Sequence, residues 1–111
     1  MFNLFKKDEV IPQSLVAYKW RCPDKIEVSI KPSKDGGYIV YVNDLPGCIT
    51  QAESGEEIFE MVNDAIYTYW EIPSHYRPYM PTFILPEELR KQLDIKIPEK
   101  YLKNPLVLQR T

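Results

Sequence analysis

The chain has 111 residues, of which 44% are hydrophobic and 27% charged, and its formal net charge is −2. No stretch approaches the ~20 consecutive apolar residues that a bilayer-spanning helix needs, so the composition is that of a globular domain. Residues 1–75 hold 7 Lys/Arg and 12 Asp/Glu, a net of −5, whereas residues 76–111 hold 7 and 4, a net of +3. Phosphate-binding domains usually carry a concentrated basic stripe, so direct nucleic-acid binding by this acidic body is disfavoured.

The N-terminus and the cysteines bear on location. Charged residues interrupt the apolar run of Met1–Glu9, which therefore lacks the apolar core of a secretory signal and predicts a cytoplasmic protein. Cys22 and Cys48 are too few for a disulfide framework. Reduced structural thiols are favoured in that compartment, and a bridge between the two remains open.

Residues 1–24 are expected to form an N-terminal extension. The alternation of Val16, Tyr18 and Trp20 with their neighbours predicts a short strand there. Residues 25–31 alternate strictly between apolar and polar side chains, which predicts a strand that is buried on one face.

A hairpin and a tight turn follow. Gly36 and Gly37 supply positive φ angles in the loop before a strand over 38–43. In Leu45-Pro46-Gly47-Cys48, proline and glycine occupy the central positions of a type II turn. The chain then reverses into a third antiparallel strand over 48–52.

A helix is predicted from Ser54 to about Trp70 or Glu71, where Pro73 ends it. Ser54 and Glu57 have the spacing of a capping box, in which each side chain satisfies a free backbone amide. The helix should pack its apolar stripe across one face of the sheet. That stripe consists of Ile58, Val62, Ala65, Ile66 and Tyr69.

The tail, residues 76–111, is rich in proline and should be extended. It predicts a strand over 82–85, a short helix that begins at Pro86, and one helical turn over 98–103. The fold class is therefore α+β: a three- to four-stranded antiparallel sheet with one long helix on one face. The chain divides into an extension (1–24), a β-β-β-α domain (25–75) and the tail (76–111).

Residues 25–72 resemble the HicB-like family of antitoxins. The shared features, in order, are Asp-Gly-Gly-Tyr entering a strand at 35–38, Asp44-Leu45-Pro46-Gly47-Cys48 at the turn, Thr50-Gln51-Ala52 ending the third strand, and a Glu-rich helix. The resemblance implies a partial RNase H-like fold. It also implies a protein that neutralises HicA, a small RNA-cleaving toxin.

The C-terminus departs from that family, whose members often append a ribbon-helix-helix or helix-turn-helix DNA-binding module. Residues 82–93 look like the strand and first helix of a ribbon-helix-helix unit, but residues 94–111 carry two prolines and offer no second helix of adequate length. DNA binding is thus in doubt. Two alternatives stay open: a stand-alone homo-oligomer without a toxin, and a transcriptional regulator whose tail completes a ribbon-helix-helix by dimerising.

The predicted helix carries acids but no Lys or Arg, which suggests a protein-binding face. Its acids are Glu56, Glu57, Glu60, Asp64 and Glu71. Like-charge pairs four residues apart cost roughly 0.2 to 0.5 kcal/mol each, so a helix selected only for stability would intersperse lysines. An anionic face of this kind would complement a cationic, RNA-binding toxin. The alternative is an ordinary solvated helix face.

Tyr67 is predicted to project from this acidic face, and Trp70 follows one turn later. Aromatic side chains beside charge are typical of interface contacts, although Trp70 could instead close the core. We predict the partner-binding residues Glu56, Glu60, Asp64, Tyr67, Trp70 and Glu71.

No catalytic, cofactor-binding or metal-binding residue is predicted. Glu27, Asp44 and Glu53 show no convergence on a metal, and neither cysteine has metal-ligand spacing. His75 has no nucleophilic partner at a suggestive spacing and is interpreted as a surface histidine. The sequence therefore predicts a binding protein and not an enzyme.

Overall fold

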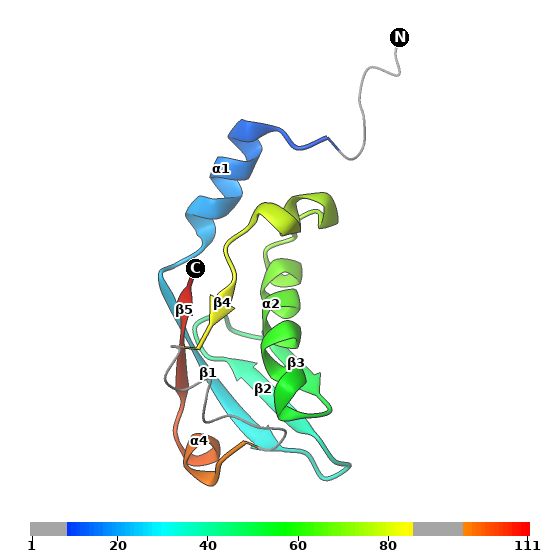
Figure 1. Ribbon diagram of the computed structural model, residues 1–111, viewed down its shortest axis with the longest axis vertical. Helices are drawn as coiled ribbons and strands as arrows, with labels where there is room; N and C mark the ends of the chain where they lie inside the picture. Colours follow the sequence, from blue (N-terminus) through cyan, green and yellow to red (C-terminus); the bar gives the residue numbers. More distant parts are fainter. Residues whose placement is uncertain (1–8, 86–96) are drawn as a thin grey trace.

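The computed structural model describes residues 9–85 and 97–111 and has an α+β architecture. In chain order the elements are α1 (Pro12–Arg21), β1 (Lys25–Pro32), β2 (Tyr38–Val42), β3 (Ile49–Ala52), the 3-10 turn η1 (Gly55–Glu57), α2 (Ile58–Tyr69), the 3-10 turn η2 (Ser74–Tyr79), β4 (Phe83–Ile84), α4 (Glu99–Lys103) and β5 (Leu106–Arg110). The strands form one antiparallel sheet in the order β3-β2-β1-β5-β4, and α2 lies across one face of it (Figure 1).

The core lies between α2 and the sheet. Alternate residues of β1 point into it, as the sequence predicted, and Ile26, Val28 and Ile30 are at most 1% exposed. On the helix side Ile58, Val62 and Ile66 are fully buried. Val40, Val42, Leu106, Leu108 and Phe83 complete this layer from the other strands.

The predicted turns are confirmed at their glycines. Gly47 has a φ of 83°, and Cys48 N–H donates to Leu45 O across the turn at 2.9 Å. Gly37 has a φ of 72°, and a Cβ at this position would collide with the carbonyl oxygen of Ala52 on β3. Glycine is therefore required there both for its backbone conformation and for the close approach of two strands.

The sheet has five strands, not three or four, because the tail contributes two. The predicted strand over 82–85 is confirmed as β4 and the turn over 98–103 as α4, whereas β5 was missed. β5 pairs with β1 on one side and with β4 on the other. The short apolar run Leu106-Val107-Leu108 was the available sequence signal, although it does not alternate, and in the structure alternate residues of β5 are buried. The short helix predicted from Pro86 lies outside the described residues.

The strand predicted within residues 15–20 is wrong, since this segment lies in the helix α1. Pro12 occupies the start of α1, where its missing N–H costs nothing. Tyr18 makes an edge-to-face contact with Tyr76 of η2, with ring centroids 5.0 Å apart, and Ile11 N–H donates to the Tyr76 hydroxyl at 3.0 Å. Tertiary contact with η2 thus favours a helix over the alternating pattern.

The capping box is also wrong. Ser54 makes no side-chain hydrogen bond to the helix start, and Glu57 makes none either. The chain enters α2 through the 3-10 turn η1, in which Glu57 N–H donates to the backbone oxygen of Ser54 at 3.2 Å. The backbone thereby satisfies a donor that the serine hydroxyl was expected to satisfy.

Asn63 on α2 closes the outer edge of β4. It is 7% exposed, and its side chain forms a two-way amide pairing with Phe83: Phe83 N–H donates to Asn63 Oδ1 at 2.7 Å, and Asn63 Nδ2 donates to Phe83 O at 2.9 Å. Nδ2 also donates to Phe59 O at 2.8 Å. The carboxamide therefore replaces a neighbouring strand at an edge that would otherwise offer free backbone groups.

Asn63→Ala should reduce the free energy of unfolding by about 2 to 4 kcal/mol, because it leaves the buried N–H and C=O of Phe83 without partners. Asn63→Asp should also destabilise, since it places a carboxylate against the Phe83 carbonyl. Urea denaturation measures both. Asn43→Ala removes an exposed amide that bonds Ser29 and Glu27 and should cost less than about 1 kcal/mol. Equal losses at the two asparagines would contradict the role given to Asn63.

Candidate protein-binding surface

Four exposed carboxylates form what we call the acidic face: Glu56, Glu60, Asp64 and Glu71. Glu60, Asp64 and Glu71 are four and seven residues apart, so they follow one line along α2 and its end. Glu56 lies just before them in η1. Because α2 contains no Lys or Arg, no basic side chain of the helix offsets these charges.

A groove of about 400 Å³ runs beside the acidic face, between α2 and β4. Phe59 contributes an apolar wall from the helix and Ile84 contributes one from the strand, where the fully buried Phe83 also borders the groove. Glu60 and Asp64 also line it. A groove with apolar walls and an acidic rim fits a segment that presents an apolar side chain flanked by Lys or Arg.

Arg77 of η2 lies at the acidic face and partly neutralises it. Its Nη1 is 3.0 Å from Asp64 Oδ1, its Nε donates to Ile72 O at 3.1 Å, and its guanidinium lies 5.8 Å from the centre of the Tyr67 ring. Sequence reasoning missed this residue because it examined charge only within the helix. The contact shows that a guanidinium fits against Asp64.

Tyr67 does not project outward as predicted. Its side chain is 8% exposed, and its hydroxyl donates to Pro81 O at 2.8 Å. Burial raises the pKa of this hydroxyl above its usual value. The tail segment that includes β4 covers the flank of α2 that carries Asn63 and Tyr67. Tyr69, predicted in the core stripe, is instead 42% exposed.

The helix ends in a Schellman motif before Pro73. Ile72 N–H donates to Tyr67 O at 2.9 Å and Glu71 N–H to Thr68 O at 3.0 Å, while Glu71 has a φ of 55°. Glycine usually occupies this left-handed position, so Glu71 adopts it at a cost in free energy. Trp70 packs against the core, and its carbonyl accepts a hydrogen bond from Arg21 at 3.2 Å.

The two thiols are free and buried, so no Cys22–Cys48 bridge is present. Burial raises the pKa of both thiols, while Arg110 slightly opposes the shift at Cys22. His75 is half-buried and contacts the ring of Tyr76. Within residues 9–85 and 97–111 there is no group of three His, Cys, Asp or Glu side chains that could hold a metal ion. Over the same part of the chain, no helix is long and apolar enough to cross a membrane.

Residues 26–100 match the family model of the HicB-like antitoxins of bacterial toxin–antitoxin systems. A UPF0150 protein of Archaeoglobus fulgidus is 46% identical over 48 residues, which cover 43% of this chain and 70% of that protein. Antitoxin HicB 1 of Photorhabdus laumondii is 41% identical over 44 residues, which cover 40% of this chain but only 28% of that antitoxin. No solved structure matches the chain.

Tyr67→Phe removes the hydroxyl that bonds Pro81 and should cost about 1 kcal/mol at neutral pH. The pKa of the Tyr67 hydroxyl is higher in the folded state than in the unfolded state. The contribution of this hydroxyl to the free energy of unfolding is therefore complete below the unfolded-state pKa of about 10, and it is lost as pH rises through the folded-state pKa. In urea denaturation, the deficit of the variant relative to the parent should therefore shrink on going from about pH 8 to about pH 11. A deficit that stays constant would contradict the burial of this hydroxyl. Tyr69→Phe is the exposed control.

Glu71→Gly should raise the free energy of unfolding by about 0.5 to 1 kcal/mol, because glycine adopts the left-handed conformation without a Cβ penalty. Thermal and urea denaturation measure the change. Glu71→Gln, which removes the charge but retains the Cβ, should not reproduce the gain. If the glutamine variant gained as much, charge at the helix end and not backbone strain would be the cause.

Proposed function

Because this chain belongs to the HicB-like antitoxin family of bacterial toxin–antitoxin systems, we propose that it neutralises a HicA-type, mRNA-cleaving toxin by binding it and masking its RNA-binding surface. The family supports an antitoxin role, and a toxin partner in general follows from it. The chain spans less than a third of the HicB antitoxin that it matches, so the identity of the partner and the mechanism belong to the proposal.

The observation that carries the proposal is the acidic face beside an apolar groove. An RNA-binding surface is cationic because it must neutralise phosphates. The acidic face would attract such a surface over a distance and raise the rate of encounter, while the apolar walls of the groove would contribute affinity once the water is displaced. Glu60 and Asp64 both lie where these two properties meet.

The contact between Arg77 and Asp64 suggests how the toxin would be held. A guanidinium already lies 3.0 Å from this carboxylate, in a position where Asp64 remains 61% exposed. A toxin arginine could therefore bind the open side of the same carboxylate, or displace Arg77 from it. We propose that Glu56, Glu60, Asp64 and Glu71 contact the toxin directly. Tyr67 and Trp70 would contribute by fixing the helix and the groove wall.

The proposal includes the finer expectations of the sequence: a partial RNase H-like fold, action in the cytoplasm, and the division into the extension, the β-β-β-α domain and the tail. It also includes a binding role without catalysis, which the antitoxin relatives favour.

Of the alternatives, the structure disfavours the ribbon-helix-helix regulator. In that motif the ribbon strand pairs with a second copy, whereas here β4 pairs with β5 of its own chain and Asn63 bonds the backbone of Phe83 on the other side. The second candidate function is a homo-oligomeric protein without a toxin. The exposed apolar side chains of α1, among them Trp20 and Val16, favour self-association.

Replacing both Glu60 and Asp64 by lysine should raise the dissociation constant of the toxin complex at least tenfold, because like charges would then face each other. The salt dependence of the remaining binding should also weaken. The partner to test is a small basic protein encoded by a neighbouring reading frame, co-expressed with this chain. Growth rescue, co-purification and titration calorimetry provide the readouts.

A matched control keeps the same change of charge away from the acidic face. Asp35 in the β1–β2 loop and Glu99 on α4 are both exposed, so replacing these two by lysine should leave the toxin complex intact. Unchanged affinity in the Glu60/Asp64 variant would end the proposal for the acidic face. Equal weakening of toxin binding in both variants would show that the net charge of the protein, and not the position of the carboxylates, causes the effect.

A further inference from the structure

The outward face of α1 is apolar and uncharged. It consists of Pro12, Gln13, Val16, Ala17 and Trp20, all of them exposed, with Val16 at 53% and Trp20 at 83%. The solvent side of a helix normally carries charged and polar residues. An exposed tryptophan on a neutral helix face is instead typical of a contact with another protein.

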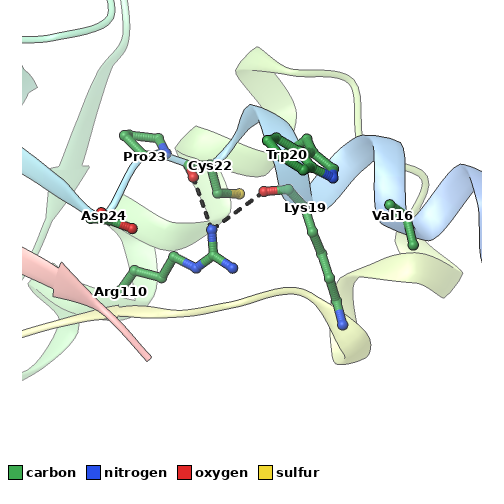
Figure 2. Close-up of a pocket in the computed structure, with 7 residues that line it drawn as sticks. All are labelled: Val16, Lys19, Trp20, Cys22, Pro23, Asp24 and Arg110. Carbon is green, nitrogen blue, oxygen red and sulfur yellow. Dashed lines mark hydrogen bonds between the residues drawn. The ribbon is translucent and has the colours of Figure 1, made fainter.

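The opposite face of α1 is already occupied, so the helix is held in a fixed orientation. Leu15 and Tyr18 pack against the core, and Arg21 donates to Trp70 O. At the end of the helix, Arg110 of β5 donates to the carbonyl oxygens of Cys22 at 3.0 Å and Lys19 at 3.5 Å (Figure 2). The Arg110 guanidinium thus gives the Cys22 carbonyl a partner at the helix end, and it is a second donor to Lys19 O, which also accepts from Cys22 N–H at 3.1 Å.

A groove of about 540 Å³ adjoins the outward face at this end of α1. Val16, Lys19 and Trp20 line it from the helix, and Cys22, Pro23, Asp24 and Arg110 line it from the junction with the sheet (Figure 2). The hollow therefore carries charges of both signs beside the uncharged face. The tryptophan is therefore not an isolated exposed residue: it stands beside a hollow that a second helix could enter.

We propose that the outward face of α1 pairs with the same face of a second copy of this chain, antiparallel, about a two-fold axis near Val16. Pro12 and Trp20 lie four residues before and four residues after Val16. An antiparallel pair centred there places Trp20 of each copy against Pro12 of the other and Val16 against Val16. Such rows of residues four apart are the ridges that pack between helices, and Ala17 is small enough to permit close approach.

The chemistry of the face favours a second copy over the toxin. A cationic toxin would be recognised by a cluster of carboxylates. The five residues of this face carry none, and in the adjoining hollow Lys19 and Arg110 accompany the single carboxylate of Asp24, whereas an uncharged apolar stripe complements itself. The net charge of −2 gives little repulsion between copies. In addition, the segment that matches the antitoxin family model begins at residue 26, after α1 has ended.

The size of the face determines how tight the pair should be. Burial of one tryptophan removes on the order of 150–250 Å² of surface, and these few residues cannot reach the ~800 Å² per partner of a stable complex. We therefore expect a concentration-dependent dimer with a dissociation constant in the micromolar range or weaker.

Sedimentation velocity of the full chain from low micromolar to near-millimolar concentration tests the pairing. The mass should rise from 13.1 kDa toward twice that value. Trp20→Ala should raise the dissociation constant at least tenfold. Tyr79→Ala, which removes a 57% exposed aromatic from η2, should leave it unchanged. Circular dichroism verifies that both variants are folded.

A cysteine at the axis tests the geometry. Val16→Cys should form a disulfide-linked dimer under mild oxidation, because the proposed axis brings the two copies of this residue together. Tyr79→Cys, which lies away from the axis, should not. The two native thiols are buried and give little background. A chain that stays monomeric throughout would overturn the proposal. The proposal would also be overturned if Ile49→Lys on β3 abolished the association and Trp20→Ala did not, because the contact would then lie on β3.

The pairing does not depend on toxin binding, so the two proposals can fail separately. If Trp20→Ala abolished co-purification of the toxin and left the sedimentation mass of the free protein unchanged, the face would be assigned to the toxin and the dimer would be overturned. A dimer that Glu60/Asp64 lysine variants leave intact would support the separation of the two surfaces.

Discussion

The amide pairing between Asn63 and Phe83 is the interaction on which the arrangement of the tail depends. It joins the middle of α2 to a strand twenty residues later in the chain through two hydrogen bonds of 2.7 and 2.9 Å. Because these groups are buried, leaving them unpaired would cost more than the bonds themselves contribute. The pairing holds β4 beside α2, which in turn forms one wall of the groove at the acidic face. The candidate binding surface therefore owes its shape to a residue that is not exposed on it.

The parts of the fold that sequence predicted correctly are those encoded locally. The turns at Gly37 and Gly47, the alternation of β1, and the buried positions Ile58, Val62 and Ile66 of α2 each depend on residues within a few positions of one another. β5 and α1 depend on distant partners. β5 pairs with β1, which lies about 80 residues earlier, and α1 is stabilised by contact with Tyr76. Short segments of this kind have ambiguous patterns on their own, and tertiary contact decides their conformation.

The candidate site shows the same limit. The helical spacing of Glu60, Asp64 and Glu71 sufficed to place them on one line, and the structure leaves them exposed. The same spacing also placed Tyr67 on that line, and there it failed, because the tail covers this flank and the hydroxyl bonds Pro81. A helical wheel records which residues share a direction, but not which later segment packs over them. For the same reason it could not reveal Arg77 beside Asp64.

The C-terminal strand connects the two surfaces that we propose. On one side β5 pairs with β4, which lines the groove by the acidic face; at its end, Arg110 caps the helix that carries Trp20. The two surfaces differ in chemistry, since one is anionic and the other uncharged, and charge governs the rate and selectivity of encounter whereas apolar burial governs retention. A partner of opposite charge and a second copy would therefore not compete for the same face. Because β5 supports both surfaces, loss of the tail from the sheet would disturb the groove wall at the acidic face and the anchoring of α1 together.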